Sequence, residues 1–179
     1  MKDSPAIASA RQWLETVVVG LKFWQFADRE LENGRVRFAV PDAETATELL
    51  MALRSELRVL TDDASVETTL LIHPQMLLDF YDFNDFLQVA DTLLIDLALE
   101  GVVQIASFHP EYQFEGTAPD DVQNYTNRSP NPMLHLIRED SLARAIAAYP
   151  DVAHIPERNV ALMQSMGSRK VRALLAKCV

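Results

Sequence analysis

Apolar residues recur with two different periods along the chain, and this alternation predicts alternating helices and strands. Spacings of three and four residues are typical of the buried face of a helix, whereas short β-branched or alternating runs are typical of strands. The first pattern predicts helices over residues 5–20, 42–60, 84–97, 140–149, 156–166 and 168–177. The second predicts strands over residues 35–40, 68–72, 102–108 and 133–137. The order along the chain is therefore α-β-α-β-α-β-β-α-α-α.

This order predicts the fold class. Strands that alternate with helices pair in parallel through right-handed crossovers, so we expect an α/β fold with a small mixed, mostly parallel four-stranded sheet and flanking helices. We expect the fourth strand to be added to this sheet after a long loop. A chain of 179 residues has the usual length of one domain, which predicts a single α/β domain over residues 1–179.

Two of the predicted strands are followed by the same dipeptide. His73-Pro74 comes after the strand at 68–72, and His109-Pro110 comes after the strand at 102–108. Ligands of open α/β sheets bind beyond the carboxyl ends of the strands. We therefore expect both histidines to lie in a ligand crevice.

The segment over residues 109–132 is predicted to be a long functional loop. Its 24 residues include four prolines and one glycine, so no long helix or strand fits it. Loops of this length without their own secondary structure are usually functional or mobile.

Composition and charge narrow the class of partner. A net charge of −10 argues against nucleic acid, because neutralising phosphates requires a basic face. No apolar run is long enough to span a membrane and no signal-like block opens the chain, so we expect a cytoplasmic protein. The single cysteine, Cys178, excludes an intrachain disulfide framework and a cysteine-based zinc site. These properties suit a small-molecule ligand and are compatible with a homo-oligomer.

The C-terminal residues 156–179 form a predicted basic helical extension. They contain five basic residues and one acidic residue, a net charge of +4 in an otherwise acidic chain. Such an extension either docks on an acidic partner or packs back on the acidic body of its own chain.

The candidate catalytic residues are two histidines and two carboxylates. His109 and His135 suit general acid or base chemistry, since histidine exchanges protons near neutral pH, and Asp121 or Asp120 would orient them. His73 and His109 are candidate ligands of a divalent transition metal. The alternatives are that the histidines bond backbone groups and that the carboxylates occupy the first turn of a short helix.

The candidate substrate-binding residues are polar side chains of the same loop. Its one cation, Arg128, carries a planar guanidinium that suits a carboxylate or phosphate, which predicts an anionic substrate. The alternative is that Arg128 pairs with Asp120 or Asp121. The other candidates are Asn127, Asn124, Ser129 and Tyr112.

The run Gln104–Thr117 is long and compositionally unusual. It resembles an uncharacterised bacterial family, domain of unknown function 1415. The resemblance extends over nearly the whole chain, including residues 69–74, 81–86, 119–121, 124–130, 134–136 and 155–159. It implies no particular activity. This chain has Trp24-Gln25 where the family tends to have a Cys-Pro pair, so any chemistry of that cysteine would be lost here.

Three functional hypotheses follow from these residues. The first is a small-molecule enzyme whose His/Asp/Arg site acts on an anionic substrate by acid/base or metal-assisted chemistry; in that case His109→Ala removes turnover and leaves folding intact. The second is a non-catalytic ligand or nucleotide sensor that uses the same crevice. The third is an architectural loop whose polar atoms are all bonded internally.

Overall fold

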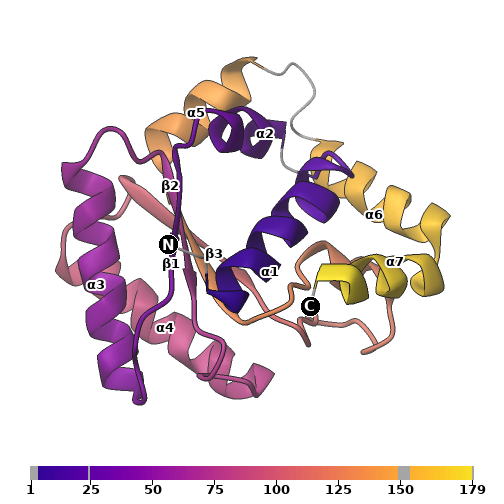
Figure 1. The fold of residues 1–179 in the computed structure, drawn as a ribbon, viewed down its shortest axis with the longest axis horizontal. Coiled ribbons are helices and arrows are strands. Elements are labelled where there is room, and N and C mark those ends of the chain that lie inside the picture. Colours follow the sequence, from indigo (N-terminus) through magenta and orange to yellow (C-terminus); the bar gives the residue numbers. More distant parts are fainter. Residues whose placement is uncertain (1–3, 24, 149–153, 179) are drawn as a thin grey trace.

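The chain forms an α/β fold around a four-stranded sheet in the computed structural model, which describes residues 4–23, 25–148 and 154–178 (Figure 1). The strands are β1 (Val36–Ala39), β2 (Thr68–Ile72), β3 (Val103–Phe108) and β4 (Met133–Arg138). The α-helices are α1 (Pro5–Trp13), α2 (Gln25–Glu32), α3 (Ala46–Asp62), α4 (Phe80–Asp96), α5 (Glu139–Ala148), α6 (Ile155–Met166) and α7 (Ser168–Leu175). Among the described residues, the π-helix η1 (Leu14–Val19) continues α1. The 3₁₀-helix η2 (Val122–Thr126) lies between β3 and β4, and the 3₁₀-helix η4 (Ala176–Cys178) follows α7.

The strand order, β1-β2-β4-β3, corrects the prediction of a mostly parallel sheet. β1 and β2 pair in parallel, but β4 is antiparallel to both of its neighbours, β2 and β3. β1, β2 and β3 do run in one direction, as the alternation with helices predicts. β4 lies between β2 and β3, and in this central position its residues Met133–Ile137 are buried.

Helices cover both faces of this sheet (Figure 1). On one face, α3 and α4 bury leucines and phenylalanines against Leu71, Leu134 and Leu136. On the other face, α1, η1 and the C-terminal helices pack on Leu70, Ile72 and other core residues. Side chains that alternate along a strand therefore enter different cores, which determines where each candidate site residue lies.

The starts of the two helices that follow β1 and β2 are set by capping residues. α3 begins at Ala46 and not at Pro41-Asp42, because Thr45 and Glu48 form a reciprocal capping box. α4 begins at Phe80, since the carboxylate of Asp79 accepts hydrogen bonds from two backbone N–H groups of the first turn. This earlier start brings Phe80 and Phe83 into the helix.

The N-terminal helix has the predicted length but not a uniform geometry. α1 ends at Trp13 and the chain continues as the π-helix η1 to Val19, one residue before the predicted end at Gly20. The aromatic stretch that follows does contribute to the core through Phe23, but its continuation forms α2, which the apolar spacing does not predict. Trp24, the first residue of the Trp24-Gln25 pair, lies outside the described residues, as does Tyr149 at the predicted end of a helix.

The basic C-terminal extension packs back on its own chain. α6 contacts η2, and α7 contacts both η1 and η2. Met163, Val171 and Cys178 are buried in the same core cluster as Trp13. An exposed ion pair also joins Arg172 to Asp120 at 3.4 Å. This packing is the second of the two alternatives for the extension. Among the described helices, none combines the length and the apolar character that a membrane span requires.

Candidate functional site

The carboxyl ends of β1 and β2 border a cavity of about 230 Å³. It lies where parallel strands of α/β sheets usually offer a ligand site. Its walls come from the residues that directly follow these two strands, namely Val40, Pro41, Asp42, Ala43, His73, Pro74, Gln75 and Met76. Of the sequence-predicted candidates, only His73 lines this cavity.

His73 has one nitrogen without a partner. Its Nδ1 lies 3.0 Å from the carbonyl oxygen of Met76, which can only accept, so Nδ1 carries the proton. Nε2 then presents a lone pair, and this atom is buried with no hydrogen-bond partner. Burial, together with the nearby His109, lowers the pKa of His73 from 6.5 to about 4. The ring is therefore neutral near pH 7 and is a hydrogen-bond acceptor.

His109 has no free nitrogen. Its Nδ1 accepts the N–H of Glu111 at 3.0 Å, and its Nε2 donates to the carbonyl of Leu77, also at 3.0 Å. Leu77 has φ 54°, in the left-handed region that leucine rarely adopts. The His109 ring is fully buried, and burial lowers its pKa. Through its bond to the Leu77 carbonyl, His109 holds the turn between β2 and α4 in place.

Aromatic rings connect the two histidines. Phe83 stacks on His73 with a centroid separation of 5.9 Å and lies 5.0 Å from the His109 ring. Phe80 extends the group, because its ring lies 5.3 Å from both His109 and Tyr112. The two imidazoles thus belong to one aromatic cluster, and their bonded nitrogens contact different backbone groups.

His135 lies on the opposite face of the sheet. It is paired with Leu70 and Ala106 in the middle of β4, and its ring is buried near Phe108 with a centroid separation of 6.2 Å. The Thr68 hydroxyl donates to a backbone carbonyl and accepts from Nε2 of His135 at 2.6 Å. Burial lowers the pKa of His135 to about 3. The three predicted histidines are therefore not brought together.

The carboxylates of the predicted loop have separate positions. Asp121 precedes η2, and its Oδ2 accepts the backbone N–H of Ala118 at 2.8 Å. Asp120 is exposed and pairs with Arg172. Neither carboxylate bonds to His109, whose two ring nitrogens bond backbone groups.

Asn124 is the most completely bonded side chain of the 109–132 segment. It is fully buried, and its Oδ1 accepts from the Phe114 N–H at 3.0 Å and the Thr117 hydroxyl at 2.8 Å. Its Nδ2 donates to the Ala118 carbonyl at 2.8 Å. Asn127 adds a bond of 3.2 Å to the Ser107 carbonyl on β3. Both amides hold backbone of their own chain.

Arg128 is bonded to its own loop and not to an aspartate. Its Nε donates to the Tyr112 carbonyl at 3.1 Å and its Nη2 to the Pro119 carbonyl at 2.6 Å. Its guanidinium also lies over the Tyr125 ring, 4.3 Å from the centroid. The backbone carbonyl of Arg128 accepts the indole N–H of Trp13 at 3.0 Å. Trp13, which no local pattern connects to this loop, fastens it to α1.

The remaining candidates have similar local contacts. The Ser129 hydroxyl donates to the Asn131 carbonyl at 2.6 Å. Tyr112 is half-buried, and burial raises its pKa while a hydrogen bond with Ser107 opposes the rise. In the part of the chain that the structure describes, no group of three or more His, Cys, Asp or Glu side chains could hold a metal ion.

The depressed histidine pKa values predict that stability falls in mild acid. Between about pH 4 and 6.5 the unfolded chain binds protons at His73 and His135 that the folded chain does not, so acidification favours unfolding. Each histidine contributes a slope of up to about 1.4 kcal/mol per pH unit in this window. Urea denaturation between about pH 5 and 6.5 measures how the free energy of unfolding depends on pH. His73→Asn should reduce this slope by the contribution of one histidine, up to about 1.4 kcal/mol per pH unit. An unchanged slope in this variant would contradict the low pKa of His73.

The sequence matches one family model. The model, described as Protein of unknown function (DUF1415), covers residues 5–173, so the chain belongs to this family. Neither the curated proteins nor the solved structures give a significant match.

Proposed function

We propose that this member of the family is a ligand-binding protein that holds a small molecule in the cavity beside His73. The proposal rests on the buried Nε2 of His73, which has no hydrogen-bond partner, in a residue that lines a cavity at the carboxyl ends of two parallel strands. A buried polar atom without a partner costs free energy, and a bound hydrogen-bond donor would remove that cost.

The lining residues indicate the chemistry of the ligand. A neutral His73 accepts from an O–H or N–H group, and the one ionisable side chain beside it in the lining, Asp42, carries a carboxylate. The ligand is therefore a neutral or cationic donor and not an anion. A volume of about 230 Å³ is smaller than the roughly 300–1,000 Å³ of drug-sized sites, which favours a small metabolite.

Binding without catalysis is favoured over the enzyme hypothesis. A histidine with a pKa near 4 is a weak base at neutral pH, so His73 suits ligand recognition better than proton abstraction. The second histidine at this edge, His109, uses both nitrogens in backbone contacts, and Arg128 uses its guanidinium within the loop. In this proposal, the 109–132 segment supports the ligand site through the bond of His109 to Leu77 in the turn after β2, and it does not contact the ligand.

Substitution of His73 tests the proposal. His73→Asn keeps an N–H donor near Nδ1 and removes the acceptor at Nε2, so it should reduce affinity for hydrogen-bond-donor fragments about tenfold, the equivalent of one hydrogen bond. Ala43→Leu should fill the cavity and block binding while leaving His73 unchanged. Fragment binding is measured by ligand-observed NMR on the full chain, with a library of small neutral alcohols, amides and amines.

His154→Asn is the matched control, because His154 is an exposed histidine at the start of α6. It should bind the same fragments as the original chain. Equal fragment affinity in the original chain, His73→Asn and Ala43→Leu would overturn the proposal.

A further inference from the structure

A second groove, with a volume of about 350 Å³, runs along β1 and is separate from the His73 cavity. Its walls are five consecutive residues of the β1 segment, two residues of α1 and two residues that precede β2. They are Gly34, Arg35, Val36, Arg37, Phe38, Ile7, Arg11, Ser65 and Val66. Three of them are arginines and none is acidic.

The groove follows an open edge of the sheet. β1 is a terminal strand, and in the described part of the chain no segment pairs with its outer side. The Arg35 carbonyl accepts the Glu67 N–H at 2.9 Å, so Arg35 and Arg37 direct their backbone groups toward β2. The alternate residues Val36 and Phe38 direct their N–H and C=O groups outward. This edge is a template for one further strand.

The two faces of the edge differ in chemistry. The side chains of Val36 and Phe38 pack on the core beneath α1, and the Arg11 guanidinium lies 4.5 Å from the centre of the Phe38 ring. Arg35 and Arg37 project from the other face of the strand, since side chains alternate along it. A strand added here would meet apolar residues on one face and guanidinium groups on the other.

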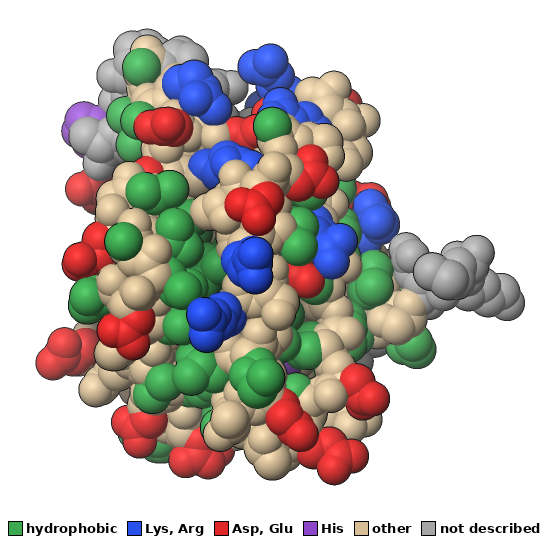
Figure 2. Space-filling view, turned by 90° about the vertical axis from the view of Figure 1, so that its left-hand side faces the viewer, with side chains coloured by type: hydrophobic (Ala, Val, Ile, Leu, Met, Phe, Trp, Pro, Cys, Tyr) green, Lys and Arg blue, Asp and Glu red, His purple; other side chains and the backbone are tan. Residues whose placement is uncertain are grey.

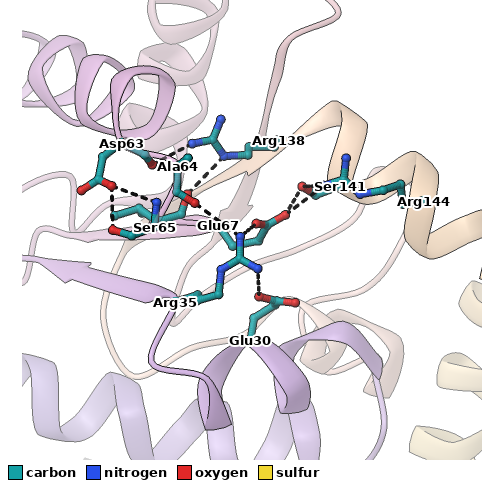
Figure 3. A network of polar contacts seen from close by, with 10 residues as sticks. Glu30, Arg35, Asp63, Ala64, Ser65, Glu67, Arg138, Ser141 and Arg144 are labelled. Atoms are coloured by element: carbon teal, nitrogen blue, oxygen red, sulfur yellow. Dashed lines mark hydrogen bonds and ion pairs between the residues drawn. The ribbon is translucent and has the colours of Figure 1, made fainter.

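The arginines are held in place by carboxylates that do not line the groove. Figure 2 shows that Lys and Arg side chains gather in the upper and middle parts of the face on the side of α3, whereas the lower part carries Asp and Glu alone among charged residues. Arg37 forms a two-pronged pair with Glu56 at 2.6 and 3.0 Å. Arg35 lies between Glu67 and Glu30, within a network that continues through Ser141 and Arg144 (Figure 3).

We propose that the β1 groove binds an extended acidic segment of a partner protein, which adds to the sheet as a strand beside β1. Its acidic residues alternate with apolar ones, so that carboxylates face Arg35 and Arg37 while apolar side chains face Val36 and Phe38. Main-chain bonds to the open edge supply affinity in this mode of recognition, and the alternate side chains supply specificity. Arginines at an edge also repel basic strands, so the same residues select for an acidic partner.

The probe is a fluorescent peptide of alternating Glu and Val, titrated against the full chain and followed by fluorescence anisotropy. It should bind saturably, and a matched peptide of alternating Lys and Val should bind at least about tenfold more weakly because its charges face arginines. Two N-methylated Glu/Val peptides test strand addition, each blocking a different alternate set of amides. One set faces β1 and the other faces away, so only one of the two peptides should lose binding.

Substitutions in the chain provide a second test. Arg37→Gln should weaken binding of the Glu/Val peptide about fivefold, as the loss of one partly exposed charge pair predicts. Arg54→Gln is the control, because Arg54 is an exposed residue of α3 that does not line the groove. Equal binding of both N-methylated peptides and the unmodified peptide would overturn strand addition. Equal binding of the Lys/Val peptide would overturn the selection for acidic residues.

Discussion

Replacing His109 by alanine is expected to lower the free energy of unfolding by about 3–5 kcal/mol, an effect of the size seen when a large buried side chain is truncated. The change leaves the Leu77 carbonyl and the Glu111 N–H without their partner. It also opens a cavity against Phe80 and Phe83. Leu77 then loses the bond that holds its left-handed backbone conformation.

Urea denaturation at pH 7 measures this loss. Met51→Ala is the control and should change stability by no more than about 0.5 kcal/mol, because the Met51 side chain is 65% exposed. The enzyme hypothesis drawn from the sequence expects the reverse behaviour, a stable His109→Ala protein without turnover. A stability loss below about 1 kcal/mol would contradict the structural role of His109 and would make it a candidate catalytic residue again.

Replacing Asn124 by alanine is expected to cost about 3 kcal/mol, since one buried amide makes three hydrogen bonds and its partners lie within the protein. Asn127→Ala removes two longer bonds of a half-buried side chain, one to the Ser107 carbonyl and one from the Thr126 hydroxyl, each 3.2 Å, and should cost about 1 kcal/mol. The two variants remove the same group from the same loop, so the difference between them reflects the bonds lost and the burial of the side chain.

Denaturation and limited proteolysis of both asparagine variants measure the prediction. Asn124→Ala should become susceptible to cleavage within residues 111–123 before the rest of the chain unfolds, because the Phe114 and Ala118 backbone loses its shared anchor. Equal stability and equal cleavage in the two variants would show that Asn124 does not hold the segment.

The local pattern of the sequence predicts elements well where a strand or helix depends on its own residues. β2 has the predicted bounds at 68–72, and β3, α6 and α7 start within one residue of the prediction. The position of β4 within the sheet was not predictable in this way, because it depends on which strands accept it as a neighbour. Its placement between β2 and β3 also puts His135 on the face opposite to His109.

The candidate site was predicted in part. The expectation that a ligand site lies beyond the strand ends led to His73, which lines a cavity there. The shared His-Pro pattern does not distinguish His73 from His109, because the difference lies in backbone groups: the Glu111 N–H reaches Nδ1 of His109, whereas Nε2 of His73 has no partner. The contact of Trp13 with Arg128 joins residues 115 positions apart, and no local pattern signals it.

The sequence pattern also does not predict that the arginines of the β1 groove lie at the edge of the sheet. The alternation of polar and apolar residues at 35–40 predicts a strand, and the structure confirms it as β1. The same alternation occurs in half-buried central strands, so the pattern does not reveal that Arg35 and Arg37 flank an open edge.

The proposed ligand site lies at the buried, unpartnered Nε2 of His73 and not among the polar residues of the 109–132 segment. Crystals of the full chain soaked with small alcohols, amides and amines test it directly. We expect bound fragments in the cavity between the ends of β1 and β2, with an O–H or N–H group within hydrogen-bond distance of His73 Nε2. Fragments bound at His109 and Arg128, with the His73 cavity empty, would contradict it.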